Sequence, residues 1–430
     1  MNINSLIVDG YANIERVELT LNGLNALVAF NNYGKSNVLK AIEFGLAFIK
    51  STPTQKSALM NQTGVIPINN KIAGLPFSFE INATFPNSIG VYMDVNYSFS
   101  FEWKRNTQNT RIISERLRVK QAGSVRAKYT QYINRTEDKA FYLVNAKGRC
   151  DKSITIDADN LVINKIANLD ELFYLDIIKR ILTIDILLIN TMQDPELYFN
   201  TVSNQSIRAE YSLDMTRNID PPFFVYSLMK MAPDSYELLK SAILSLLPAI
   251  EDVEPIEIDL KELSLGNDNS APFSRPEKFY DIRVKERYNN QQTSIRSISA
   301  GSKKIIYTLA MAIGADINRV PLIMFEELEN SIHPALFQSL LMTFDAICPN
   351  TKIILTSHSP YLIKYLSAEK IKIGVPNSEG LAMFKEIKPS KEKRILALAS
   401  EEGVTLGDYI FSVMYDAQQG DVEFLNDICV

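Results

Sequence analysis

Cysteine and histidine are scarce in this 430-residue sequence. Its three cysteines, Cys150, Cys348 and Cys429, are widely spaced and form no CxxC pair, so neither a disulfide framework nor a zinc site is indicated. The two histidines, His333 and His358, are too few for a histidine-rich metal site. The chemistry of this chain must therefore come mainly from other residue types.

The sequence also lacks a strong charge bias and a long apolar run. Its formal net charge at pH 7 is −5, so we expect no bulk attraction to nucleic acid or to an anionic membrane. The longest apolar stretches, such as residues 181–190, are about half of the roughly 20 residues that span a membrane, and no leader begins the chain. We expect a cytoplasmic, globular protein of two or three domains without membrane contact.

Hydrophobic periodicity divides the chain into parts. Alternating apolar residues predict antiparallel strands over most of the first 135 residues, interrupted by a helix from Lys35. Spacings of three and four predict a helical insertion, clearest at 168–188 and 234–253. Residues 278–287 return to strand, and helix and strand alternate over 302–366, which favours a doubly wound α/β core. The predicted domains are an N-terminal lobe, the helical insertion, a C-terminal lobe and a candidate partner-binding extension, at 1–160, 161–255, 256–375 and 376–430.

Residues 29–42, AFNNYGKSNVLKAI, are almost a phosphate-binding loop. Backbone N–H groups that lead into a helix N-terminus cradle phosphates, and here Lys35 adds a positive charge and Ser36 a hydroxyl for Mg²⁺. Ala29 stands where the pattern has its first glycine, which alanine can replace if its φ is negative. Taken alone, so degenerate a match is about equally often a chance match and a true phosphate-binding loop.

Residues 320–330, VPLIMFEELEN, are an apolar run that ends in paired carboxylates. A buried strand of this kind delivers acidic groups to a magnesium nucleotide at its C-terminal edge. We assign Glu326 to the metal and Glu327 to the attacking water. The alternative is a strand that ends at a solvated, acidic helix start.

Two shorter motifs accompany the carboxylates. SISAGSKK places Ser299 and Gly301 at the start of an apolar helix, where they also fit a simple helix cap. TSHSPYLI places His358 after a β-branched strand, where a lone histidine is more often structural than catalytic. Neither motif decides a function by itself.

The order of the four motifs is that of an ATP-binding-cassette head. The sequence resembles the structural-maintenance-of-chromosomes, RecF and overcoming-lysogenization-defect branch of these ATPases. The likeness rests on GLNALVAFNNYGKSNVLKAIEF, SISAGSKK, FEELENSIHP and TSHSPYLI, and it covers residues 1–50 and 278–366. It implies an α/β fold: an N-terminal antiparallel β lobe, a doubly wound, mostly parallel core sheet and a helical insertion.

The resemblance also implies that ATP and Mg²⁺ bind between the heads of a homodimer or larger homo-oligomer. One copy supplies the metal ligands Ser36 and Glu326, the catalytic Glu327 and the γ-phosphate sensor His358, and the other brings Ser299 and Gly301 to the γ-phosphate. His333 is expected to fix the helix after the carboxylates. The remaining nucleotide-binding residues on the first copy are Asn31, Asn32, Tyr33, Gly34, Lys35 and Asn37.

Three residues depart from the pattern of this branch. Ala29 replaces glycine, Glu326 stands where many relatives have aspartate, and Leu328 stands where relatives have proline. Nucleotide binding should survive these changes because Lys35 and the backbone cradle remain, whereas rapid hydrolysis is an open question. The glutamine that completes the metal shell is unassigned, with Gln193 as a candidate.

The C-terminal residues indicate which member of this branch the chain resembles. Residues 359–430 hold no acidic cluster of the kind that two-metal nucleases need, so we expect no nuclease activity here and a separate nuclease subunit. A stand-alone head with a short insertion and a C-terminal extension resembles the ATPase of two-gene anti-phage systems of the Septu or PARIS type. There the ATPase scaffolds and restrains its partner.

A basic stretch at 104–135 keeps an alternative open. It carries nine Lys or Arg residues and one Glu, which suits a phosphate backbone, and Tyr129 and Tyr132 suit base stacking. A solvated hairpin face is the other interpretation. A RecF-like DNA-repair ATPase, and a nucleotide-binding structural protein without turnover, therefore stand beside the nuclease scaffold.

Overall fold

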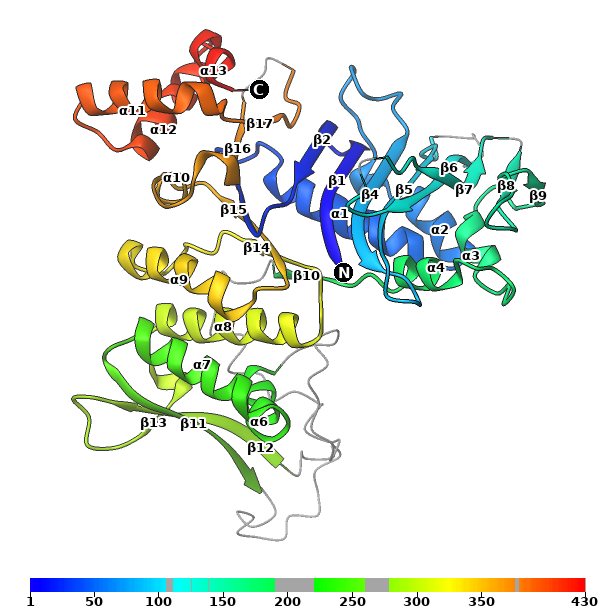
Figure 1. The fold of residues 1–430 in the computed structure, drawn as a ribbon. Helices are drawn as coiled ribbons and strands as arrows, with labels where there is room; N and C mark the ends of the chain where they lie inside the picture. The colour runs from blue at the N-terminus through cyan, green and yellow to red at the C-terminus, as the bar shows by residue number, and fades with distance from the viewer. Residues whose placement is uncertain are drawn as a thin grey trace, which may run out of the picture. The chain divides into compact units, whose positions relative to one another are not determined.

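The structure is a computed structural model (Figure 1) that describes residues 1–105, 111–124, 126–137, 139–189, 220–259, 278–375 and 379–429. The chain splits into two compact units. One unit comprises Met1–Leu188 and Lys352–Val430, and the other comprises Ile189–Thr351. In the described ranges no helix is long and apolar enough to cross a membrane.

An eight-stranded sheet dominates the first unit, in the order β2-β1-β4-β5-β6-β7-β8-β9. Each pair of neighbours is antiparallel, as the alternating sequence predicts. The strands are β1 (Asn2–Tyr11), β2 (Ile14–Thr20), β4 (Phe77–Pro86), β5 (Tyr92–Phe101), β6 (Ile112–Gln121), β7 (Thr130–Arg135), β8 (Ala140–Tyr142) and β9 (Lys152–Ser153).

The aromatic residues of this sheet pack against helix α1 (Lys35–Lys50). Phe48 of α1 stacks on Phe101 with ring centroids 4.7 Å apart, and Phe44 meets Phe77 edge-on at 5.0 Å. A methyl group on Gly45 would overlap the Phe79 ring, so glycine is needed for this close approach. The helix that carries the phosphate-loop lysine is thereby anchored on a rigid aromatic core.

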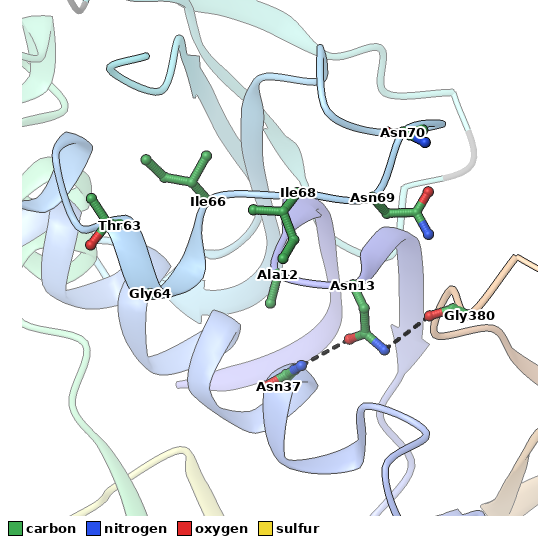
Figure 2. Close-up of a pocket in the computed structure, with 10 residues that line it drawn as sticks. All are labelled: Ala12, Asn13, Asn37, Thr63, Gly64, Ile66, Ile68, Asn69, Asn70 and Gly380. Atoms are coloured by element: carbon green, nitrogen blue, oxygen red, sulfur yellow. Dashed lines mark hydrogen bonds between the residues drawn. The ribbon is translucent and has the colours of Figure 1, made fainter. Parts of the chain in front are cut away.

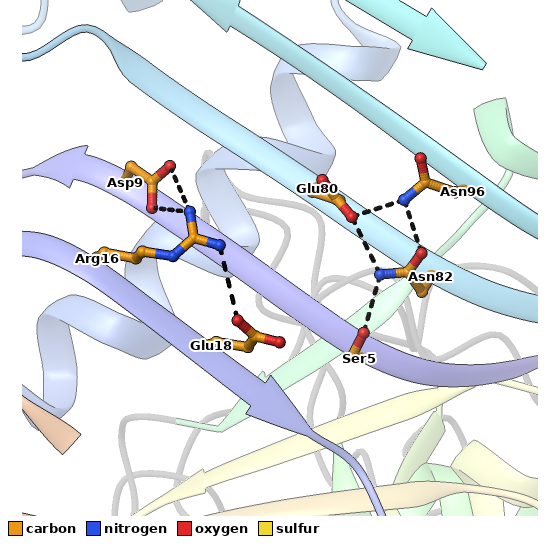
Figure 3. Close-up of polar contacts among 7 residues, drawn as sticks. All are labelled: Ser5, Asp9, Arg16, Glu18, Glu80, Asn82 and Asn96. Atoms are coloured by element: carbon orange, nitrogen blue, oxygen red, sulfur yellow. Dashed lines mark hydrogen bonds and ion pairs between the residues drawn. The ribbon is translucent and has the colours of Figure 1, made fainter. Parts of the chain in front are cut away.

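Polar side chains also gather on these strands (Figure 3). Arg16 pairs with Asp9 at 3.2 Å and with Glu18 at 3.6 Å. Farther along, the Asn96 amide donates to Glu80 and to Asn82, at 2.6 and 2.7 Å. Some side chains of the sheet thus make apolar contacts with α1, and others form polar networks that include residues of both charges.

A parallel arrangement follows in the same unit. β3 (Leu24–Val28) is fully buried and pairs in parallel with β15 (Lys352–Ser357) and β16 (Ile371–Gly374), and β17 (Phe384–Glu386) joins β16 antiparallel. The remaining helices of this unit are α2 (Pro53–Met60), α3 (Val162–Ile166), α4 (Leu175–Leu182), α10 (Tyr361–Tyr365), α11 (Glu392–Glu401), α12 (Leu406–Gln418) and α13 (Glu423–Ile428), with 3-10 turns η1 (Thr63–Val65), η4 (Ala368–Lys370) and η5 (Pro389–Lys391).

The second unit combines helices with a small antiparallel sheet. Helix α6 (Pro221–Met231) packs on β11 (Ile250–Asp259) and β12 (Lys278–Glu286), and β13 (Thr293–Ser294) completes that sheet. Phe223, Tyr226 and Tyr280 form an aromatic cluster between helix and sheet. The other elements are α7 (Pro233–Leu246), η3 (Ile295–Ser297), α8 (Ala300–Ile317), β14 (Leu322–Glu326) and α9 (Pro334–Ile347).

These observations confirm the predicted α/β class with an antiparallel N-terminal sheet and a mixed core sheet. The helix predicted over 168–188 is partly wrong. The described helix α4 ends at Leu182, and β10 (Ile186–Ile189) follows as a strand. Isoleucine favours strands because it is branched at Cβ, and this local preference outweighs the helical spacing in the short run ILLI.

Candidate functional site

The candidate phosphate loop, residues 29–34, connects β3 to α1; it is called the phosphate loop below. Asn32 and Gly34 have φ angles of +65° and +89°, and Gly34 occupies the N-cap of α1. Left-handed residues before a helix turn successive backbone N–H groups towards one anion. Gly34 supplies no capping side chain, so the helix N-terminus keeps its affinity for negative charge.

Lys35 crosses this loop. Its Nζ donates to the carbonyl oxygens of Ala29 and Phe30, at 2.8 and 2.9 Å, and the side chain is buried. The ammonium group is therefore bound to the first two residues of the loop. Ser36, the next residue of α1, and Asn37 follow on the first helical turn.

Ala29 is accommodated without backbone strain. Positive φ values outside glycine occur, among the described residues, at Ala12, Asn32, Arg319, Glu327 and Ser331, and Ala29 has none. A methyl group on Gly374 of β16 would overlap the Ala29 Cβ, so glycine at 374 provides the room that alanine at 29 uses. The expected condition for replacing the first glycine is confirmed.

The turn that carries His358 lies beside the loop. Ser357 of β15 pairs with Val28 of β3, and its carbonyl accepts from the Ala29 N–H at 3.2 Å. The Ser357 Oγ accepts from the Ser359 N–H at 2.9 Å, which shapes the turn around His358. The structure thus brings His358 to the strand next to the phosphate loop.

The carboxylate pair ends β14 in the second unit. Glu326 is the last strand residue, and Glu327 adopts a φ of +49°, a region that costs a non-glycine residue about 1–3 kcal/mol. The Asn330 amide donates to the Glu327 Oε2 at 2.9 Å and fixes its side chain. Leu328 is completely buried, so leucine at this position serves the core.

Lys304 of helix α8 binds the turn that contains Glu327 and Asn330. Its buried Nζ donates to the Glu327 and Asn330 carbonyls, at 3.1 and 2.9 Å, and burial lowers the pKa of Lys304 to about 8. A Cβ on Gly301 would lie 2.5 Å from the Ser331 carbonyl oxygen, so only glycine allows this contact. The sequence analysis missed Lys304, although it lies three residues after Gly301.

Two capping residues behave as the local sequence indicates. The Ser299 hydroxyl accepts from the Ser302 N–H at 3.2 Å and caps α8, which is the alternative considered for this motif. His333 caps α9, because its Nδ1 accepts from the Ala335 N–H at 3.3 Å and Pro334 begins the helix. The expected role of His333 in fixing that helix is confirmed.

A pocket of about 750 Å³ lies beside the start of α1, and the sequence analysis did not predict it. Asn13 is central: its Oδ1 accepts from the Asn37 amide at 2.8 Å, and its own amide donates to the Gly380 carbonyl at 3.5 Å (Figure 2). A Cβ on Gly34 would lie 2.8 Å from that Oδ1. The lining residues are Ala12, Asn13, Asn37, Thr63, Gly64, Ile66, Ile68, Asn69, Asn70 and Gly380.

The basic stretch forms part of the hairpin β6–β7. The prediction that Tyr132 is available to stack on bases is wrong. Tyr132 is buried against Tyr174, with ring centroids 4.5 Å apart, because it faces the core of the lobe. Tyr129 is 44% exposed, with Lys120 4.9 Å from its ring. Lys120 also lies 3.6 Å from Asp94, so acidic residues neutralise part of this face. Gln193 lies outside the described residues.

Comparisons with known proteins bear on part of the chain. Residues 180–364 match the family described as "AAA domain, putative AbiEii toxin, Type IV TA system", which is less than half of the sequence. No curated protein matches the chain significantly.

Three solved structures are similar at low identity. The SmcHead bound to the C-winged helix domain of ScpA is 12% identical with a TM-score of 0.49, and covers 92% of this chain and 100% of its own. The SMC head domain from Thermotoga maritima is 10% identical with a TM-score of 0.43 and coverages of 90% and 100%. The Smc head with an extended coiled coil, bound to the C-terminal domain of ScpA from Pyrococcus furiosus, is 13% identical with a TM-score of 0.42 and coverages of 93% and 99%.

Proposed function

We propose that this chain is an ABC-type ATPase head that binds ATP and acts as a nucleotide-gated scaffold or sensor for a separate nuclease in anti-phage defence. The observation that carries the ATP-binding part is the phosphate loop. It combines a buried lysine, two left-handed residues and the N-terminus of a 16-residue helix. These features supply the cation and the aligned N–H groups that a triphosphate requires.

The donor atoms present suit Mg²⁺, which would accompany ATP. Ser36 supplies a hydroxyl directly after Lys35, and Glu326 supplies a carboxylate at the end of a buried strand. Mg²⁺ prefers hard oxygen ligands of these kinds and, when bound, neutralises charge on the β- and γ-phosphates. We assign both residues to the metal.

We assign the chemistry of hydrolysis to Glu327 and His358. Glu327 would accept a proton from the attacking water, and the Asn330 amide that binds its Oε2 would keep the carboxylate oriented. His358 would contact the γ-phosphate from the turn beside Ala29. Ser299 and Gly301 would act on the nucleotide of a second copy, so that ATP closes two heads on each other.

The pocket around Asn13 is our candidate for the nucleoside end of ATP. It adjoins Asn37 on the first turns of α1, and its volume lies in the range of about 300–1,000 Å³ that small ligands occupy. Its amides offer both donors and acceptors, as a purine edge requires, and Ile66 and Ile68 offer apolar contact.

Two observations support a partner chain. Residues 359–430 show no acidic cluster for two-metal cleavage, and the description of the matched family includes the words "AbiEii toxin, Type IV TA system". We propose that a separate subunit carries the nuclease activity. Co-expression of this chain with the product of its neighbouring gene, purified with and without ATP, tests this part. A nuclease that copurifies and changes activity with ATP is expected, and its absence under both conditions would contradict the scaffold role.

A second candidate function is that of a RecF-like ATPase that binds DNA when loaded with ATP. It is favoured by Arg116, Arg118 and Lys120, which alternate along β6 and so share one face of the strand. Binding of this chain alone to duplex DNA, strengthened by ATP, would favour this function over the nuclease scaffold.

A further inference from the structure

Helix α12 of the C-terminal extension contacts the phosphate loop. The rings of Phe411 and Phe30 meet edge-on, with centroids 5.6 Å apart and an interplanar angle of 81°. Phe30 in turn packs on Tyr33, with ring centroids 6.4 Å apart. Through Phe30, Phe411 of α12 is joined to both aromatic residues of the loop.

The same helix reaches the turn that carries His358. A methyl group on Gly407 would overlap the carbonyl oxygen of Pro360, so the first turn of α12 lies directly on that backbone. Thr405 fixes where the helix begins, because its hydroxyl accepts from the Asp408 N–H at 3.2 Å. One helix therefore contacts both the phosphate loop and the histidine turn.

Other residues after His358 also pack on the loop. Gly374 makes room for Ala29, and a Cβ on Gly34 would lie 2.7 Å from the Ala382 Cβ. These contacts belong to the backbone framework around β16. By contrast, Phe411 of α12 contacts the loop through its side chain, so this contact can be removed without disturbing the sheet.

We propose that Phe411 is a positioning residue that holds the phosphate loop, through Phe30 and Tyr33, in its nucleotide-binding conformation. This inference rests on the proposed function, because it concerns the affinity of the same ATP site. The physical reason is preorganisation: a loop already held in the bound conformation loses less conformational entropy when ATP binds. Because coupling between binding and contact formation is reciprocal, bound ATP must also stabilise α12.

The first test compares two phenylalanines of the extension in the full-length chain. An edge-to-face pair is worth enough to change affinity about two- to tenfold, so Phe411→Ala should weaken ATP binding by that factor in a calorimetric titration. The matched control is Phe424→Ala, because Phe424 of α13 meets Tyr409 at 6.1 Å within the same extension. Phe424→Ala should leave the ATP affinity unchanged. Phe411→Tyr, which keeps the aromatic ring, should bind ATP with the affinity of the wild type. Equal affinities for Phe411→Ala and wild type would overturn the inference.

A double-variant cycle shows whether Phe411 acts through Phe30. If it does, the Phe30→Ala, Phe411→Ala double variant should bind ATP no more weakly than Phe30→Ala alone. Additive losses would mean that Phe411 acts by another route, contrary to the proposal.

Amide hydrogen exchange supplies a readout that a merely structural role would not change. ATP should slow exchange over residues 406–418 in the wild type and leave it unchanged in Lys35→Ala. Unchanged exchange in a wild type that binds ATP would overturn the inference alone. If the wild type fails to bind ATP at all, the proposed function itself is wrong.

Discussion

The space between Ala29 and Gly374 holds only one methyl group, because a Cβ on Gly374 would overlap the Cβ of Ala29. Gly374 ends β16, whose residue Ile373 pairs in parallel with Val28, the residue before Ala29. The alanine at the head of the phosphate loop is thus matched by a glycine on the neighbouring strand. This relationship explains how the loop tolerates the loss of its first glycine.

Gly374→Ala should therefore weaken ATP binding, because the added methyl group displaces Ala29 and the loop that follows it. Overpacking of a tight contact typically costs about 1–3 kcal/mol. Ala29→Gly alone should leave affinity within a few fold, and the Ala29→Gly, Gly374→Ala double variant should recover most of the loss. Calorimetric titration of all four proteins is the measurement. A double variant as weak as Gly374→Ala would show that the two positions are not coupled.

Lys35→Ala should abolish measurable ATP binding. The variant removes the buried cation that the Ala29 and Phe30 carbonyls hold at the loop. A hydrogen bond to a charged group is worth about 1.5–3 kcal/mol, and several phosphate oxygens would share this lysine in the proposed site, so we expect a loss of about a hundredfold or more. Lys40→Ala is the control, because Lys40 is an exposed lysine of the same helix. Unchanged affinity in Lys35→Ala would refute the nucleotide site.

Local motifs made much of this protein predictable. The loop before Lys35 and the strand before Glu326 could be predicted because the residues that give them their chemistry are consecutive in the sequence. The Asn13–Asn37 contact and the Phe30–Phe411 contact were not, because each joins segments that no motif links. Lys304 was missed because a lysine in a helix normally faces solvent, and only the fold shows that two carbonyls bind it.

The second candidate function makes its own prediction. Replacing Arg116, Arg118 and Lys120 with Gln should weaken DNA binding and reduce the slope of log affinity against log salt by about 0.9 for each lost phosphate contact. The matched control replaces three exposed basic residues of the same lobe, Lys147, Arg149 and Lys152. If both triple variants keep the wild-type slope, the β6–β7 hairpin is a solvated face, and DNA binding loses its structural basis.

Lys56 should make stability depend on pH. Its ammonium is completely buried, donates to the Ser51 carbonyl and to the Asn164 amide oxygen, and burial lowers the pKa of Lys56 to about 8 from 10.5. Between these values the unfolded chain binds more protons than the folded one, so the free energy of unfolding contributed by Lys56 rises as pH increases from 8 to 10.5. The expected rise is on the order of 1–3 kcal/mol.

Urea unfolding of Lys56→Met across this range is the measurement. The wild type should gain stability relative to the variant as pH rises, whereas Lys40→Met should follow the wild type. A constant difference between wild type and Lys56→Met would show that Lys56 keeps an ordinary pKa in the folded protein.

Glu327→Gln should trap a nucleotide-bound dimer. Lys35, Ser36 and Glu326 would still hold ATP and Mg²⁺, whereas the amide cannot accept a proton from water, so only the chemical step should slow, by about 10²–10⁴-fold. Ser299 and Gly301 would reach the γ-phosphate from a second copy, so a persisting triphosphate should keep two heads closed. Light scattering with ATP and Mg²⁺ should give twice the monomer mass for Glu327→Gln and the monomer mass for Lys35→Ala, and Glu329→Gln controls for loss of charge in the same turn. If Glu327→Gln and Lys35→Ala have the same mass with and without nucleotide, ATP does not drive head pairing.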